Sequence, residues 1–244
     1  MIGLILAAGE GKRLNNHLKQ NVSKPLVKIN CKCLIEYSLQ NCVNFGIKTV
    51  IVVVNPNNKF DIYSMIGDEF NGMKIIYAVQ KEPKGLINAV MSASEYLDDC
   101  IMLQLSDEIF IKPKVPKCTV EYENGADFIV TYVYESDKEK IKNNFSIETD
   151  ETGNIVNCIE KPEIIINAFK GTGLCFFNFE CIKLLKSHYD CEKNYPDNLC
   201  DYFNFLIKCH KIGKTCCIAE EEINVNTTAE LNYAQMRIRD EKEQ

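Results

Sequence analysis

The sequence predicts an α/β fold with a mixed, mainly parallel sheet, helices on both of its faces and a small substrate-binding lobe. Short, continuous apolar runs recur along the first hundred residues, as expected for strands covered on both faces. Segments with apolar residues at helical spacing lie between these runs. Strands that alternate with helices at these lengths are typical of a parallel sheet, whereas the second half mixes strands, a hairpin and helices.

The first half supplies strands and helices in alternation. We expect strands at residues 2–7, 49–54, 74–79 and 101–105. One helix ends at Gly46, a typical C-cap residue, and its apolar face is formed by Leu34, Ile35, Leu39, Cys42 and Val43. A second helix precedes the last of these strands, and its apolar face is formed by Leu86, Ala89, Val90, Ala93 and Leu97.

The second half predicts a more mixed set of elements. We expect strands at residues 127–133, 174–177 and 216–219, and a helix at 197–209. Residues 145–159 predict a hairpin that turns at 150–153 (Asp-Glu-Thr-Gly). The tail from residue 230 to 244 has helical character and ends in a charged segment.

The composition excludes some classes of protein. The net charge of −6 over 244 residues argues against a nucleic-acid partner, which normally requires a basic surface. No apolar run reaches the roughly 18 residues of a membrane span, and the apolar start lacks the basic region of a signal peptide, so we expect no membrane association and a cytoplasmic location. The thirteen cysteines lack zinc-site spacing, and we interpret them as free thiols that serve as small core residues.

The order of elements predicts where a ligand binds. In open parallel sheets, ligands lie outside the carboxyl ends of the strands. This rule selects residues 8–13, 80–85 and 106–110 as parts of one convergent site.

The first of these segments has the composition of a phosphate-binding turn. Residues 6–13 read Leu-Ala-Ala-Gly-Glu-Gly-Lys-Arg, so Gly9 and Gly11 let the backbone approach a phosphate. Leu14 replaces the third glycine of a dinucleotide fingerprint, and no Walker A spacing is present. A glycine turn beside Lys12 and Arg13 suits a triphosphate. An ordinary strand-to-loop turn is the alternative interpretation.

Two further segments offer nucleotide contacts. Lys24 lies in residues 23–26 (Ser-Lys-Pro-Leu), where a solvated lysine is the alternative. In residues 80–86 (Gln-Lys-Glu-Pro-Lys-Gly-Leu), the Gln80 amide is suited to reading a base edge, and Gly85 would let a base or sugar lie close to the backbone. A helix-initiating loop explains the same residues equally well.

Three segments offer metal and acceptor contacts. Asp107 follows a buried strand, where a carboxylate is well placed to hold Mg²⁺. In residues 159–162 (Ile-Glu-Lys-Pro), Glu160 could accept sugar hydroxyls and Lys161 could bind a phosphate, with Gly173 shortly after. Residues 223–227 (Ile-Asn-Val-Asn-Thr) provide two asparagines, Asn224 and Asn226, as candidate second metal contacts, although the stretch alone would predict a helix N-cap.

In this order and spacing, the segments resemble the sugar-1-phosphate nucleotidylyltransferase family, which includes glucose-1-phosphate thymidylyltransferases and related cytidylyl- and uridylyltransferases. The resemblance runs from residue 2 to about residue 231. It implies a Rossmann-like core and a transferase domain over residues 1–232, with a triphosphate-binding part at about 1–112 and an acceptor-binding part at about 113–232. Residues 233–244 would form a charged helical tail.

The resemblance also implies roles for individual residues. Arg13, Lys24, Asp107 and Lys161 would be catalytic, and Asp107, Asn224 and Asn226 would be candidate ligands of Mg²⁺. Nucleotide contacts would come from Ala7, Ala8, Gly9, Gly11, Gln80, Pro83 and Gly85. Glu160 and Gly173 would contact the acceptor.

The same resemblance implies an Mg²⁺-dependent transfer of a nucleoside monophosphate to a sugar 1-phosphate, with release of pyrophosphate. Ser106 stands where the family usually has Gly, and the late motif has Asn where thymidylyltransferases have Asp. The Asn-containing late motif and the pair Ala7 and Ala8 favour CTP or UTP over dTTP. Two alternatives stay open: a cytidylyltransferase for a non-sugar phosphate such as phosphocholine or a phosphonate, and a regulatory nucleotide-binding protein with a weakened metal site. The oligomeric state also stays open, a homo-oligomer included.

Overall fold

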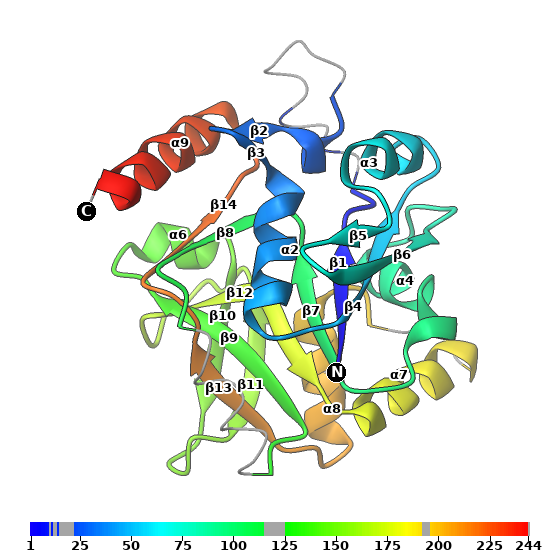
Figure 1. Cartoon of the computed structure of the whole chain (residues 1–244). Coiled ribbons are helices and arrows are strands. Elements are labelled where there is room, and N and C mark those ends of the chain that lie inside the picture. Colours follow the sequence, from blue (N-terminus) through cyan, green and yellow to red (C-terminus); the bar gives the residue numbers. More distant parts are fainter. Residues whose placement is uncertain (10, 12–13, 15–21, 115–124, 192–195, 244) are drawn as a thin grey trace.

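The computed structural model describes residues 1–9, 11, 14, 22–114, 125–191 and 196–243. Its centre is a mixed sheet in the order β11-β10-β12-β7-β1-β4-β6-β5, with β9 paired to β12 and β13 paired to β9 (Figure 1). Four neighbouring strands run parallel: β7 (Ile101–Leu105), β1 (Ile2–Leu6), β4 (Thr49–Val54) and β6 (Met73–Val79). They confirm the predicted parallel strands of the first half.

The parallel strands are buried on both faces, which explains their continuous apolar sequences. Along β1, Leu4 and Leu6 pack into one hydrophobic cluster, whereas Ile5 and the following Ala7 pack into another on the opposite face. Because successive side chains of a strand point to opposite faces, each residue of the run enters a core. The predicted α/β fold class is confirmed.

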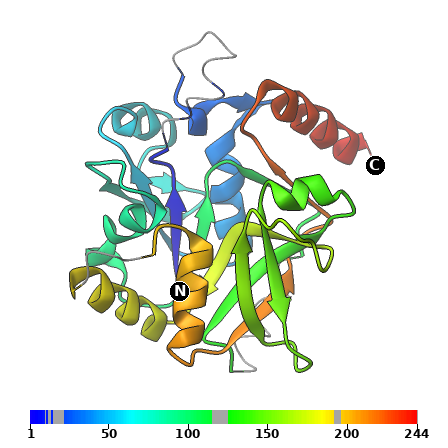
Figure 2. The same ribbon diagram turned by 180° about the vertical axis from the view of Figure 1, so that it is seen from behind.

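Helices cover both faces of this sheet. α2 (Leu34–Asn44) and α3 (Lys59–Ile66) contribute to the cluster on one face, with α2 in front of the sheet in Figure 1. α4 (Leu86–Met91), α7 (Phe179–Cys191) and α8 (Leu199–Lys208) contribute to the other cluster, and α7 and α8 lie in front of the sheet when it is viewed from behind (Figure 2). Gly46 follows α2 with φ of +72°, as its predicted place at the helix end requires.

One predicted helix is interrupted. A continuous helix through residues 86–97 is wrong, because α4 ends at Met91 and a 3₁₀ turn occupies Ser94–Tyr96. The Ser92 hydroxyl donates to the Asn88 carbonyl at 2.8 Å, and the Ala93 N–H bonds to the Val90 carbonyl, which tightens the last turn. Ala93 and Leu97 are nevertheless fully buried, so the apolar pattern correctly marked the inner face.

The second half extends the sheet with antiparallel strands. The predicted hairpin is formed by β10 (Phe145–Thr149) and β11 (Ile155–Glu160), and the predicted strand at 127–133 is β9 (Phe128–Tyr134). β12 (Phe169–Phe177) begins earlier than predicted, and β13 is found at Gly213–Cys217 rather than 216–219. A short antiparallel strand β5 (Glu69–Phe70) closes the far edge, and α6 (Lys138–Lys142) follows β9.

A separate two-stranded ladder links the two halves near the C-terminus. β8 (Glu108–Ile111) pairs with β14 (Glu221–Asn224), and α9 (Thr228–Glu243) packs Leu231, Ala234 and Ile238 into a third hydrophobic cluster with both strands. The small ladder β2–β3 (Lys28–Ile29 and Lys32–Cys33) lies next to α9. Among the described helices, none combines the length and apolar character needed to cross a membrane.

Candidate active site

The three loops that the sequence predicted to converge line one cavity. It lies at the carboxyl ends of β1, β6 and β7 and has a volume of about 520 Å³. Its polar lining is formed by Gly9, Gly11, Lys24, Gln80, Gly85, Ser106, Asp107 and Asn226. Apolar walls are formed by Leu6, Ala8, Leu14, Pro25, Pro83, Leu86, Ala89 and Leu105. A cavity with apolar walls and a few convergent polar groups is typical of a small-molecule site.

The glycine turn after β1 packs directly on Lys24. Gly11 has φ of +63°, and a Cβ added there would lie 2.6 Å from the Lys24 Cβ. Both the backbone conformation and the close approach therefore require glycine at this position. Arg13, like Glu10 and Lys12, lies outside the described residues, so its predicted role stays a prediction.

Two asparagines that the sequence reasoning missed hold the start of this turn. The Asn58 side-chain amide donates to the Ala7 carbonyl at 2.8 Å, and the Asn55 amide donates to the Ala8 carbonyl at 2.8 Å. In a trans peptide the C=O and the following N–H point in opposite directions. Fixing these carbonyls therefore also fixes the direction of the Ala8 and Gly9 N–H groups. The asparagine-rich sequence 55–58 (Asn-Pro-Asn-Asn) directly after β4 was the available signal.

A lysine, an aspartate and an asparagine converge at one side of the cavity. The Lys24 ammonium forms an ion pair with the Asp107 carboxylate and donates to Asn226 Oδ1 at 2.8 Å. The side chain of Lys24 is 11% exposed and that of Asp107 is 22% exposed, so the pair is largely withdrawn from water. The Asp107 carboxylate and Asn226 Oδ1 thus both face the Lys24 ammonium.

The β8–β14 ladder brings Asp107 and Asn226 together. Asn224 pairs with Glu108 in the ladder, and the Val225 N–H donates to the Asp107 carbonyl at 2.9 Å. Asn226 Nδ2 donates to Asn224 Oδ1 at 2.6 Å, so Asn226 lines the cavity while Asn224 lies behind it. Thr227 directly precedes α9 as its N-cap: its hydroxyl accepts the Glu230 N–H at 3.3 Å, and the Glu230 carboxylate accepts the Thr227 N–H, as this stretch alone predicted.

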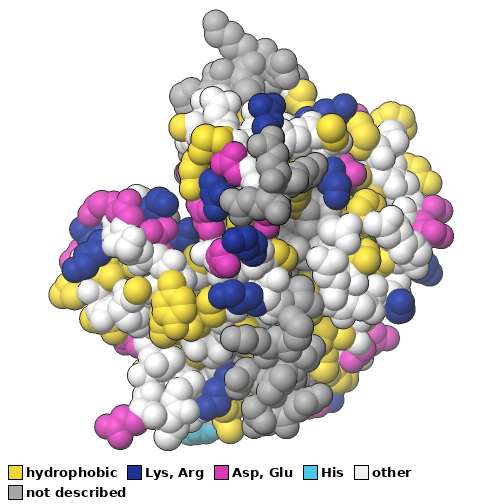
Figure 3. Space-filling model, turned by 60° about the vertical axis from the view of Figure 1, so that its left-hand side comes forward, with side chains coloured by type: hydrophobic (Ala, Val, Ile, Leu, Met, Phe, Trp, Pro, Cys, Tyr) yellow, Lys and Arg dark blue, Asp and Glu magenta, His cyan; other side chains and the backbone are white. Residues whose placement is uncertain are grey.

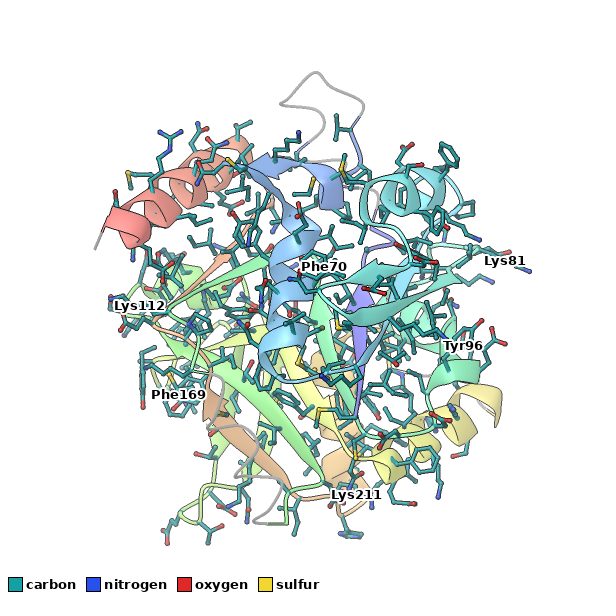
Figure 4. All side chains as sticks on the ribbon, in the orientation of Figure 1. Phe70, Lys81, Tyr96, Lys112, Phe169 and Lys211 are labelled. Atoms are coloured by element: carbon teal, nitrogen blue, oxygen red, sulfur yellow. The ribbon has the colours of Figure 1, made fainter. Side chains whose placement is uncertain are left out.

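Gln80 has its amide nitrogen fixed by the protein. Gln80 Nε2 donates to the Gly85 carbonyl at 3.1 Å and to Asn88 Oδ1 at 2.9 Å. Gln80 is 7% exposed and lines the cavity, whereas Lys81, the next residue, points away from the body of the molecule (Figure 4). The end of β6 therefore presents one polar side chain to the site and the other to solvent.

A buried charged cluster lies behind Asp107. The Gly173 N–H donates to both carboxylate oxygens of Glu108, at 2.7 and 2.9 Å, and the Lys170 ammonium pairs with Glu222 at 2.8 Å. Burial raises the pKa of Glu108 well above its usual range, and the negative charges of Glu222 and Asp107 raise it further. Burial also raises the pKa of Glu222, and the Lys170 ammonium opposes that effect.

Gly173 supports the site from behind. A Cβ at this position would lie 2.4 Å from Leu105 Cγ and 2.7 Å from Glu108 Oε1, so any other residue would displace the cavity wall or the buried carboxylate. Its N–H is engaged by Glu108.

Three other candidate residues do not line the cavity in the part of the chain that the structure describes. Ala7 is buried in the cluster beneath α2 and α3 and contributes its carbonyl to Asn58. Glu160 and Lys161 are exposed at the end of β11, where the Lys161 N–H bonds to the Asn144 carbonyl. The acceptor contacts implied for Glu160 and Lys161 stay predictions.

The surface carries charges of both signs. On the face shown in Figure 3, Lys and Arg side chains are interspersed with Asp and Glu side chains and with exposed hydrophobic ones. This distribution agrees with the net charge of −6.

Comparison with known sequences identifies related proteins. The family described as Nucleotidyl transferase matches residues 2–218. A UTP–glucose-1-phosphate uridylyltransferase of Haloferax volcanii is 31% identical over 163 residues, which cover 67% of this chain and 66% of that protein. A glucose-1-phosphate thymidylyltransferase of Mycolicibacterium smegmatis is 29% identical over 191 residues, which cover 77% and 64%. The chain thus spans just under two thirds of the length of these relatives.

Solved structures share the fold over nearly the whole chain. A putative glucose-1-phosphate thymidylyltransferase from Bacillus anthracis, in complex with sucrose, superposes with a TM-score of 0.85 and covers 98% of this chain and 96% of its own. UDP-glucose pyrophosphorylase complexed with UDP-glucose gives a TM-score of 0.81, with 98% of each chain covered. Each is 18% identical to this chain, so the likeness is one of fold.

Proposed function

The chain belongs to the nucleotidyl transferase family, and on that premise we propose that it transfers a nucleoside monophosphate from a nucleoside triphosphate to a sugar 1-phosphate and releases pyrophosphate. The observation that carries the proposal is the convergence of Lys24, Asp107 and Asn226 beside the glycine turn in one cavity. The turn suits a polyphosphate, and the convergent polar groups suit the metal and the charge that accompany it. The names of the relatives support the same class of reaction.

The chemistry requires no protein nucleophile. The phosphate monoester of the acceptor has a second pKa of about 6, so it is largely dianionic near neutral pH. One of its oxygens forms a bond to the α-phosphorus of the triphosphate while the bond from that phosphorus to the pyrophosphate oxygen breaks. The protein's contribution is to align the two reactants and to neutralise their charge. Lys24 supplies a cation at the cavity, and the backbone of the glycine turn supplies N–H donors.

The donor set at Asp107 fits Mg²⁺. Asp107 and Asn226 both direct an oxygen atom to the Lys24 ammonium, so a second cation would find two hard oxygen ligands there. Among the described residues no group of three or more His, Cys, Asp or Glu side chains could hold a metal, which agrees with an ion that takes most of its ligands from phosphate oxygens and water. When bound, Mg²⁺ would neutralise negative charge on the triphosphate and the departing pyrophosphate.

We extend the proposal to the nucleotide and to the cellular compartment. Ala8 at the cavity wall and Asn226 at the metal position favour CTP or UTP over dTTP, because both features are commoner in the cytidylyl- and uridylyltransferase branches. We place the protein in the cytoplasm. The cysteine side chains that the structure describes form no disulfide, as expected in a reducing compartment.

A pyrophosphate-release screen tests the proposed function. The common triphosphates are combined with sugar 1-phosphates, phosphocholine and a phosphonate in the presence of Mg²⁺, with Asp107→Ala as the inactive control. We expect the highest rate with a sugar 1-phosphate. A clear preference for phosphocholine or the phosphonate would show that the acceptor is a non-sugar phosphate and not a sugar 1-phosphate. Nucleotide binding without turnover of any acceptor would instead indicate a regulatory protein.

A further inference from the structure

The amide of Gln80 belongs to a hydrogen-bonded chain that reaches two helices. Gln80 Nε2 donates to Asn88 Oδ1 at 2.9 Å, and Asn88 Nδ2 donates to the Tyr189 hydroxyl at 2.7 Å. Asn88 lies on α4, 8 positions after Gln80, whereas Tyr189 lies on α7, 101 positions after Asn88. The family resemblance assigns no role to either residue.

The direction of this chain is set by a backbone group. The Gly85 carbonyl can only accept a hydrogen bond, and it lies 3.1 Å from Gln80 Nε2. The nitrogen end of the Gln80 amide must therefore face Gly85. Asn88 must then turn its own oxygen toward Gln80, since two NH₂ groups facing each other would repel, and its nitrogen points to Tyr189. Both N–H groups of Gln80 are engaged, and Oε1 is the polar atom that this side chain offers to a ligand in the cavity.

We propose that Asn88 and Tyr189 are positioning residues that hold Gln80 with Oε1 toward the bound base, so that the site selects bases by the presence of an N–H donor at that point. This inference rests on the proposed function, because it assigns the base to the Gln80 end of the cavity. Gln80 would be the residue in contact with the base, and Asn88 and Tyr189 would act through it.

A fixed oxygen discriminates between the two common pyrimidines. Uracil carries an N–H donor at ring position 3 and an oxygen acceptor at position 4, whereas cytosine carries an acceptor at position 3 and an amino donor at position 4. Whichever position faces Oε1, one pyrimidine donates to it and the other places a second acceptor against it. Adenine and guanine differ in the same way at positions 1 and 6. An amide free to rotate would accommodate either member of a pair.

The test compares dissociation constants of UTP and CTP, and of ATP and GTP, by calorimetry without acceptor. Wild-type protein is compared with Asn88→Ala, Asn88→Asp and Tyr189→Phe, and with Ser92→Ala as the matched control. The Ser92 hydroxyl, at the C-terminal end of α4, donates to the Asn88 backbone carbonyl and takes no part in the side-chain bonds that link Gln80, Asn88 and Tyr189. We expect wild-type protein to favour one member of the tighter-binding pair by at least about tenfold, since an unsatisfied buried polar group is costly. Asn88→Ala should bring this ratio close to unity.

The other variants separate positioning from general damage. Asn88→Asp keeps an oxygen opposite Gln80 Nε2 and should restore most of the ratio, Tyr189→Phe should reduce it partly, and Ser92→Ala should leave it unchanged. A wild-type ratio within twofold of unity, or an Asn88→Ala ratio within twofold of wild type, would overturn the inference. If no nucleotide binds to wild-type protein, both the inference and the proposed function fail. If the Asn88→Ala variant still catalyses transfer and its ratio of dissociation constants equals that of wild type, the inference fails but the proposed function stands.

Discussion

The Lys24 ammonium pairs with the Asp107 carboxylate across 83 positions of sequence and donates to Asn226 across 202. These contacts join the 3₁₀ helix at Lys24–Leu26, the turn after β7 and the segment after β14 at one point. Charge-assisted hydrogen bonds are among the stronger polar interactions in proteins. The geometry of the proposed metal site therefore depends on three segments that are remote in the chain, and each can be tested separately.

The carboxylate of Asp107 should be required for metal-dependent turnover. Transfer should need Mg²⁺ or Mn²⁺ and should fall by about 10² to 10⁴ in Asp107→Ala, because a charge contact worth several kcal/mol in the transition state is lost. Steady-state rates with and without excess chelator check this. Near-normal turnover in that variant would remove Asp107 from the site.

Asn226 should matter more than Asn224. Asn226 lines the cavity and accepts from Lys24, whereas Asn224 supports it through a hydrogen bond of 2.6 Å. We expect Asn226→Ala to raise the Mg²⁺ concentration needed for half-maximal activity by about tenfold or more, and Asn224→Ala to have a smaller effect. Metal titrations of the transfer rate measure both. The reverse order of effects would assign the metal contact to Asn224.

The asparagines of the β4–α3 loop should support nucleotide binding. Asn58→Ala removes the donor to the Ala7 carbonyl and leaves a buried acceptor unsatisfied, which should weaken triphosphate binding by about five- to tenfold. The neighbouring Asn57 is exposed, so Asn57→Ala is the matched control. Calorimetric titration without acceptor and thermal unfolding should be measured together. Unchanged affinity accompanied by a lower Tm would show that Asn58 serves stability alone.

Asp127 should contribute a pH-dependent part of the stability. Burial alone would raise the pKa of Asp127, but hydrogen bonds from the Ile212 N–H and the Asn178 amide, together with the Lys211 ammonium, outweigh it and lower the pKa. A carboxyl whose pKa is lower in the folded state stabilises the fold above its unfolded pKa of about 3.9, and this contribution is lost as the pH falls through the folded pKa.

Asp127→Asn should therefore lower the free energy of unfolding by about 1–2 kcal/mol at pH 7, and the difference should shrink below about pH 4. Denaturant unfolding at several pH values checks this, with the exposed Asp98→Asn as the control. A difference that stayed constant down to pH 3 would show that the charge of Asp127 is not its source.

The sequence could predict the parallel core and its loops because their signals are local. A strand buried on both faces must be apolar at every position, and its ligand-binding loop follows directly, as with β1 and the turn at Gly9 and Gly11. The same local pattern could not show that the helix beginning at Leu86 breaks after Met91. The Ser92 side chain competes there for a backbone carbonyl.

The remaining elements depend on partners that are distant in the sequence. Glu108 and Glu222 can be buried in β8 and β14 only because their carboxylates have partners. The Gly173 N–H donates to the Glu108 carboxylate, and the Lys170 ammonium neutralises the Glu222 carboxylate. Thr172 lies within β12 and is fully buried, and its hydroxyl is satisfied by the Thr131 hydroxyl at 2.5 Å, a partner 41 positions away. Pairing of this kind between buried polar groups leaves no periodic pattern in the sequence, so it could not be predicted.

The fate of isotopically labelled oxygen tests the central claim most directly. The acceptor that reacts fastest in the screen is prepared with ¹⁸O in the three non-bridging oxygens of its phosphate, and the products are analysed by mass spectrometry. If the acceptor oxygen attacks the α-phosphorus, all three labelled atoms remain in the nucleotide-linked product and the pyrophosphate carries none. Labelled pyrophosphate, free nucleoside monophosphate as the main product, or a doubly phosphorylated acceptor together with a nucleoside diphosphate would contradict the account.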